Sequence, residues 1–102
     1  MTEDYTYPAG EYILLGKITR AHGLRGEVKM LSYSGHPENV GGYREIVLVE
    51  RSAKLSAPLA IVKSRVQGKT AIVQLASITT RTEAEAIEGR GVLLSKQYLP
   101  DA

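Results

Sequence analysis

A short loop at residues 20–26 separates two apolar segments and is the feature that most constrains the fold. Gly23 and Gly26 allow positive backbone φ at little cost, so the chain can turn tightly within this loop. The segments on either side, 12–19 and 27–33, carry apolar residues in patterns typical of strands. The sequence therefore predicts a β-hairpin whose loop is shaped by glycine.

Four further strands are expected along the chain. They lie at residues 44–50, 59–67, 70–75 and 92–95. In the second of these, alternation places Leu59, Ile61, Lys63 and Arg65 on one face, and we expect a half-exposed strand with a basic outer row. A tight turn over Gln67, Gly68 and Lys69 joins this strand to the next one.

One helix is predicted near the C-terminal end. Thr80 followed by Glu83 forms a capping box, and Gly89 supplies a stop signal, so a helix of two to three turns is expected within residues 80–88. The loop at 34–43 contains Pro37 and predicts at most one helical turn there.

Short antiparallel strands in one domain usually close into a small barrel, because closure removes exposed strand edges. We therefore expect an all-β fold, a six-stranded antiparallel β-barrel with one short helix near the C-terminus. The expected organisation is a flexible N-terminal tail at 1–11, a barrel domain at 12–96 and the start of a linker at 97–102.

The composition excludes several classes of site. The chain has 102 residues, enough for one domain, and no cysteine, so disulfides and thiolate metal sites are ruled out. His36 has no second ligand at metal-binding spacing, and we expect neither a metal nor a cofactor. No apolar stretch is long enough to cross a bilayer, which predicts a soluble, cytoplasmic protein without a membrane partner, and we expect a monomer.

Charge is segregated along the chain, although the net charge is only +2. Residues 51–82 contain six cations and no carboxylate, whereas acids gather near both ends. The hairpin segment adds Lys17, Arg20, Arg25 and Lys29 against Glu27 alone. Such segregation predicts a basic face suited to a phosphate backbone, and the alternative is a set of solvated charges with no partner.

Two motifs carry a resemblance to a known family. The first is Gly-Lys-Ile at residues 16–18 followed by Ala-His-Gly-Leu-Arg-Gly-Glu-Val-Lys at residues 21–29. The second is Thr-Arg-Thr-Glu-Ala-Glu-Ala-Ile-Glu-Gly at residues 80–89, which is similar to an Arg-x-x-Ala-Glu-x-Leu-x-Gly helix. Together they resemble the N-terminal domain of the RimM family of bacterial ribosome maturation factors, also called 16S rRNA-processing proteins.

This resemblance implies a fold and a function. Family members have a first barrel similar to the second domain of translation elongation factors, followed by a PRC-type barrel that this chain would lack. The implied function is non-enzymatic: assistance to small (30S) subunit assembly and 16S rRNA processing by binding the subunit head. The implied partners there are small-subunit ribosomal protein number nineteen and nearby 16S rRNA.

The same resemblance suggests which residues contact the ribosome. Arg20, Arg25 and Lys29 would contact phosphates, while Gly23 and Gly26 would let the backbone approach. His22 either contacts RNA or holds the loop in shape. The full set of candidate contacts is Lys17, Arg20, His22, Gly23, Leu24, Arg25, Gly26, Lys29, Lys63, Arg65 and Lys69.

Three other functions fit parts of the sequence. A generic RNA-binding barrel would need exposed aromatic residues, which are scattered here. A protein-docking module could insert Leu24 into a groove, independently of salt. A flavin-type reductase barrel could use Glu27 and His22 as an acid/base pair, but no nucleophile or phosphate-binding motif supports an enzyme.

Overall fold

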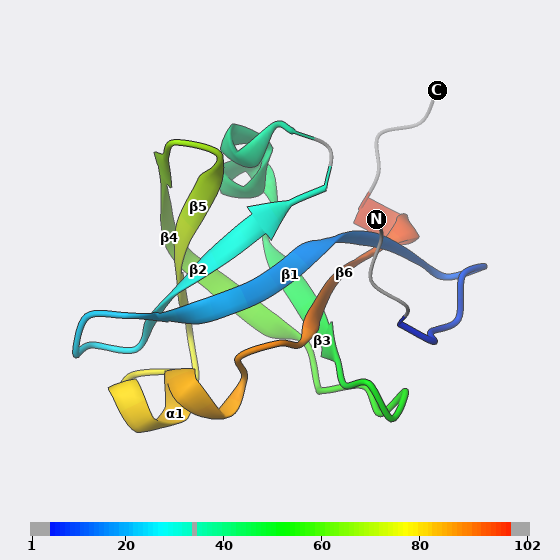
Figure 1. Ribbon diagram of the computed structural model, residues 1–102. Helices are drawn as coiled ribbons and strands as arrows, with labels where there is room; N and C mark the ends of the chain where they lie inside the picture. The colour runs from blue at the N-terminus through cyan, green and yellow to red at the C-terminus, as the bar shows by residue number, and fades with distance from the viewer. Residues whose placement is uncertain (1–4, 34, 99–102) are drawn as a thin grey trace.

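The computed structural model describes residues 5–33 and 35–98. Six strands form a closed antiparallel barrel in the order β1-β2-β5-β4-β3-β6, and β1 closes the ring by pairing with both β2 and β6 (Figure 1). The elements are β1 (Tyr12–His22), β2 (Glu27–Ser32), η1 (Pro37–Gly42), β3 (Glu45–Val49), β4 (Leu59–Gln67), β5 (Thr70–Leu75), α1 (Arg81–Ala86), β6 (Gly91–Ser95) and η2 (Lys96–Tyr98). The predicted all-β barrel is confirmed, with α1 as the one α-helix of the described residues.

The first strand is longer than the sequence pattern predicted. Arg20 pairs with Lys29 and His22 pairs with Glu27, so β1 continues to His22 and the turn is confined to residues 23–26. The expected loop at 20–26 was therefore wrong at its start. Cross-strand pairing keeps these polar residues in the strand even though they break the apolar pattern.

The barrel interior is filled by one face of each strand. Inward side chains come from alternate positions, as in Val28 and Met30 of β2 and Val73 and Leu75 of β5. The fully buried members of this cluster are Ile18, Val28, Met30, Leu48, Ala71, Val73, Leu75, Ala84 and Val92. Ala84 of α1 belongs to the same cluster, so the helix packs under the open end of the barrel.

A second apolar cluster lies outside the barrel. On β3, Ile46 and Leu48 face the interior, whereas Val47 and Val49 pack outward with Leu93 and Tyr5. This arrangement explains the uninterrupted apolar sequence of β3, because both of its faces are buried.

Tyr5 covers the outer cluster from the N-terminal segment. Its side chain is only 9% exposed, its hydroxyl donates a hydrogen bond to the Gly89 carbonyl, and the Arg51 guanidinium lies 5.0 Å from its ring centroid. A Cβ at Gly91 would lie 3.1 Å from the Tyr5 ring, so glycine makes room for it. Within the tail expected at 1–11, Tyr5 therefore packs against the barrel, while residues 1–4 lie outside the described residues.

A bulge in β4 separates its basic residues from the apolar residues that were predicted to share their face. Ile61 pairs with Leu75 and the next paired residue, Lys63, is opposite Gln74, so Val62 is the extra residue of a β-bulge. A bulge reverses the alternation that follows it. Leu59 and Ile61 therefore pack against the core, whereas Lys63 and Arg65 face outward, and the expectation that all four share one face was wrong.

The remaining elements differ from the predictions mainly in length. Helix α1 has six residues rather than two to three turns, and its chain turns away at Gly89, where φ is +85°. η1 is a 3-10 helix of six residues where a single turn was expected. Most of the predicted linker at 97–102 lies outside the described residues.

No helix among the described residues has the length and apolar character needed to cross a membrane.

Replacement of Tyr5 tests the contribution of the N-terminal segment to stability. We expect Tyr5→Ala to lower the free energy of unfolding by about 3 kcal/mol, because it removes a buried ring, and Tyr5→Phe to lower it by about 1 kcal/mol through the lost hydrogen bond. Urea titration followed by circular dichroism measures both. Thr6→Ala, at the exposed neighbouring position, is the control. Equal stability of the wild type and Tyr5→Ala would contradict the packing described.

Candidate functional site: a basic face and a braced glycine loop

Three basic side chains and one isoleucine form a row across the outer surface of four strands. Arg20 is opposite Lys29, Lys29 is opposite Ile72, and Ile72 is opposite Arg65, so these four residues cross β1, β2, β5 and β4 in register. Neighbouring strands lie about 5 Å apart, so such a row brings cations within reach of consecutive phosphates. We call this set the basic row.

Ile72 occupies the centre of the basic row and is 1% exposed. Its neighbours Ala71 and Val73 face the interior, so Ile72 points to the outer surface. Its position between Lys29 and Arg65 indicates that the aliphatic stems of these residues cover it while their charged ends remain in water.

Arg65 is engaged within the protein. Its Nη1 lies 3.1 Å from Glu27 Oε2, and its Nη2 lies 3.2 Å from His22 Nε2. The arginine can only donate, so His22 accepts through the unprotonated Nε2. This geometry favours a role for His22 in holding the loop in shape over a role in contacting RNA. The ion pair is partly exposed, since the Arg65 side chain is 54% exposed, so we expect it to orient the side chains more than it stabilises the fold.

The structure gathers most of the predicted contact residues on this face, with one exception. Lys63, opposite Gln74, lies one position nearer the glycine loop than the basic row, and Lys17, opposite Leu31, lies on the far side of it. Lys69 lies in the β4–β5 turn, beyond the pairing of Thr70 with Gln67, and therefore sits at the opposite end of the face from the loop. It is not brought together with the other candidates near the loop.

The glycine loop is braced by a residue that the sequence did not single out as a contact or support. Arg81 Nη1 donates a hydrogen bond of 2.9 Å to the Gly23 carbonyl, and Arg81 Nε lies 3.0 Å from Glu85 Oε2. A cation at the first position of a helix opposes the helix dipole, which indicates a specific partner elsewhere. That position was the available signal for Arg81.

The other side of the loop rests on the chain before α1. Gly26 has φ +88°, and a Cβ there would collide with the Ile78 carbonyl oxygen and lie 2.8 Å from the Thr79 carbonyl carbon. The Ile78 carbonyl is in turn held by Gln74 Nε2 at 2.6 Å. Gly23 has φ +74°, but a Cβ added there would have no atom within 4 Å, so only backbone conformation requires glycine at this position.

The capping box fixes the start of α1. The Thr80 hydroxyl accepts a hydrogen bond from the Glu83 N–H at 3.1 Å, and Glu83 Oε1 accepts from the backbone N–H groups of Thr79 at 2.9 Å and Thr80 at 3.2 Å. The Thr79 N–H bond, with help from the threonine hydroxyls, holds the pKa of Glu83 below its usual range. The predicted capping box is confirmed.

The chain after α1 is fastened to the same hairpin. Glu88 Oε2 accepts a 2.8 Å hydrogen bond from the Ala21 N–H, and Ile18 exchanges backbone hydrogen bonds with Gly89 and Arg90. Glu83, Glu85 and Glu88 therefore all accept hydrogen bonds within the protein, Glu83 at the start of α1, Glu85 from Arg81 and Glu88 from β1.

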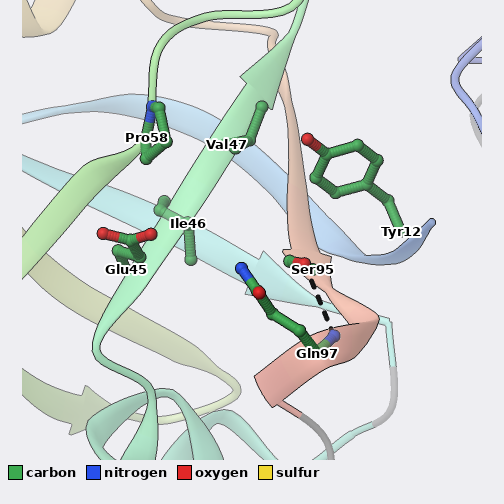
Figure 2. A pocket seen from close by; sticks show the side chains of 7 residues that line it. All are labelled: Tyr12, Glu45, Ile46, Val47, Pro58, Ser95 and Gln97. Carbon is green, nitrogen blue, oxygen red and sulfur yellow. Dashed lines mark hydrogen bonds between the residues drawn. The ribbon is translucent and has the colours of Figure 1, made fainter.

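A small hollow lies at the other end of β1 (Figure 2). Its volume is about 60 Å³, and it is lined by Tyr12, Glu45, Ile46, Val47, Pro58, Ser95 and Gln97. An open, mostly polar groove of about 400 Å³ adjoins it at Glu11 and Lys96. Ligand sites are usually enclosed, mostly apolar and several hundred Å³ in volume, so neither space supports the flavin alternative.

No group of three or more His, Asp and Glu side chains that could hold a metal ion occurs within residues 5–33 and 35–98. His36 lies 3.4 Å from Glu38 in an exposed pair. The candidate site consists of cations and a backbone loop with exposed Leu24 at its tip, an arrangement suited to binding.

The fold and this surface define a class: a small closed barrel that presents a basic face and a braced hairpin tip. Comparison with known proteins gives the family. The family model described as the RimM N-terminal domain matches residues 13–99. The chain belongs to the RimM family and corresponds to its N-terminal domain.

Individual relatives agree with this assignment. The ribosome maturation factor RimM of Pseudomonas fluorescens is 34% identical over 93 residues, covering 91% of this chain and 51% of the relative. That of Thermotoga neapolitana is 33% identical over 90 residues, covering 88% of this chain and 51% of the relative. The chain therefore spans about half the length of the curated relatives it matches.

Solved structures support the fold. A crystal structure of a 16S ribosomal RNA processing protein RimM from Pseudomonas aeruginosa matches with a TM-score of 0.78 and 27% identity, covering 89% of this chain and 54% of that one. The solution structure of the N-terminal domain of RimM from Thermus thermophilus matches with a TM-score of 0.70 and 22% identity, covering 88% and 95% of the two chains. The second likeness is one of fold.

The two loop glycines should respond differently to alanine. We expect Gly26→Ala to lower the free energy of unfolding by more than about 2 kcal/mol, because it adds a collision to an unfavourable φ, and Gly23→Ala by about 1 kcal/mol through φ alone. Thermal and urea unfolding measure both. Gly10→Ala, with open space around the added Cβ, is the matched control. Equal losses at positions 23 and 26 would show that the loop does not rest on residues 78–79.

Acidification should weaken the capping box. Because the folded-state pKa of Glu83 is depressed, its contribution to stability is present above the unfolded-state value of about 4.3 and is lost as the pH falls through the lower folded-state value. We expect Glu83→Gln to flatten the fall in stability below that pH, as measured by urea unfolding at a series of pH values. Glu11→Gln, at an exposed position, should retain the wild-type profile.

Proposed function

We propose that this chain acts in maturation of the small ribosomal subunit by presenting the basic row and the glycine loop to 16S rRNA of the subunit head. The observation that carries the proposal is the alignment of Arg20 with Lys29 across β1 and β2, next to a loop in which Arg25 is exposed. The names of the relatives, ribosome maturation factor and 16S ribosomal RNA processing protein, support the same role.

The chemistry of the face suits a phosphate backbone. Arg20, Arg25 and Lys63 are exposed, and each can release condensed counterions when it contacts a phosphate. Glu27, the carboxylate on this face, is neutralised by Arg65. Backbone approach at Gly23 adds shape-dependent contact.

Two finer points belong to the same proposal. The role is non-enzymatic, since the site holds cations and a loop in place of an acid/base or nucleophile arrangement. Ribosomal protein number nineteen of the small subunit is the proposed protein neighbour of the rRNA contact. In this proposal the barrel domain occupies residues 12–96, and the segment from residue 97 begins a connection to a second domain.

Co-sedimentation with purified free small subunits tests the RNA contact. We expect binding to weaken as salt rises. The dependence is measured as the slope of log binding constant against log salt concentration. Arg20→Ala and Arg25→Ala should each reduce the magnitude of this slope by about 1. Lys54→Ala is the control, because it removes the same charge from the exposed β3–β4 connection across the barrel.

Two results would reject the RNA contact. One is binding that does not change between low and moderate salt. The other is an equal loss for Lys54→Ala and Arg20→Ala, since that would assign the effect to net charge and not to this face.

A further inference from the structure

The tip of the β1–β2 hairpin exposes an apolar side chain that the RNA contact does not use. Leu24 is 81% exposed, more than any other large hydrophobic residue within 5–33 and 35–98. Turns usually carry polar or small residues, and three of the four residues at 23–26 fit that rule. The leucine at position 24 is the exception.

The chain holds this tip in place on both sides of Leu24. The carbonyl of Gly23 accepts the hydrogen bond from Arg81, and Gly26 packs against the Ile78 carbonyl. Arg81 is itself held by Glu85. A leucine on such a support loses little conformational freedom on binding, so more of its burial energy is realised as affinity.

The chemistry of Leu24 indicates a protein and not RNA as its partner. An aliphatic side chain gains free energy only where apolar surface closes around it, whereas RNA offers phosphates, hydroxyls and base faces that stack best on planar groups. The flanking Arg25 is exposed and Arg20 lies on the adjoining strand, so the matching pocket would carry acidic groups at its rim.

We propose that Leu24 is an anchor that inserts into an apolar pocket with an acidic rim on a ribosomal protein of the small subunit, and that Arg81 is the positioning residue that presents it. This inference rests on the proposed function, because it places the hairpin tip against the same subunit. It adds a contact of different chemistry from the phosphate contacts of the basic row.

Photo-crosslinking identifies the partner class. The photoreactive residue p-benzoylphenylalanine replaces leucine at position 24, and the chain is irradiated with purified free small subunits. We expect the crosslinked product to be a ribosomal protein. Crosslinking to 16S rRNA alone, or no crosslink while the chain sediments with the subunits, overturns the proposal.

Binding measurements separate the anchor from the basic row. We expect Leu24→Ala to weaken binding to small subunits by roughly tenfold or more, equally at low and moderate salt, because the lost contact is apolar. Arg20→Ala should instead lose its effect as salt rises. Leu24→Ala should leave the urea midpoint unchanged, since the side chain is 81% exposed.

Arg81→Lys tests positioning, because it keeps the charge and loses the fork that bonds both Gly23 and Glu85. We expect it to weaken binding, to speed hydrogen exchange in the loop, and to have little further effect in a chain that already carries Leu24→Ala. Wild-type binding by Arg81→Lys overturns the positioning role, and wild-type binding by Leu24→Ala overturns the anchor. If the unsubstituted chain does not bind small subunits, the proposed function and the anchor both fail.

Discussion

The structure depends on the close approach of β1 to β2 at Gly16. A Cβ at this position would collide with the Leu31 carbonyl oxygen, so only glycine lets the strands lie this near. Register shifts follow on both edges of β1, between Leu14 and Gly16 toward β6 and between Ile18 and Arg20 toward β2. Bulges of this kind bend and twist a strand, which allows one strand of 11 residues to serve both neighbours and close the ring.

The contacts between α1 and the β1–β2 hairpin also affect which charged side chains are exposed. Helix α1 is joined to the hairpin at its first residue, through Arg81 to the Gly23 carbonyl, and beyond its last residue, through Glu88 to the Ala21 N–H. Glu83, Glu85 and Glu88 accept hydrogen bonds within this region, whereas cations occupy outward positions of β1 and β4. A protein with a net charge of only +2 therefore presents a basic surface on one side.

Local patterns predicted much of the fold, and long-range pairing explains what they missed. Alternation and turn residues located all six strands, and the Thr80 and Glu83 pair located the helix, because each depends on neighbours in sequence. The bulge at Val62 depends on how β4 pairs with β5, so strict alternation placed Leu59 and Ile61 on the outer face with Lys63 and Arg65, whereas they pack against the core. The burial of Tyr5 requires Gly91 and Val49, which are distant in sequence. For the site, the basic residues were foreseeable by type, but the engagement of Arg65 by Glu27 was not.

The pairing of β1 with β6 has a consequence for how the chain folds. Tyr12 lies opposite Ser95, so the ring cannot close before β6 has been synthesised. Until then, the β1–β2 hairpin keeps one unpaired edge, and the outer apolar cluster lacks Leu93. Such non-local closure is a slow class of folding step. Tyr5 precedes its hydrogen-bond partner Gly89 by 84 residues. During synthesis, the surface on which Tyr5 packs therefore forms only after most of the barrel has been made.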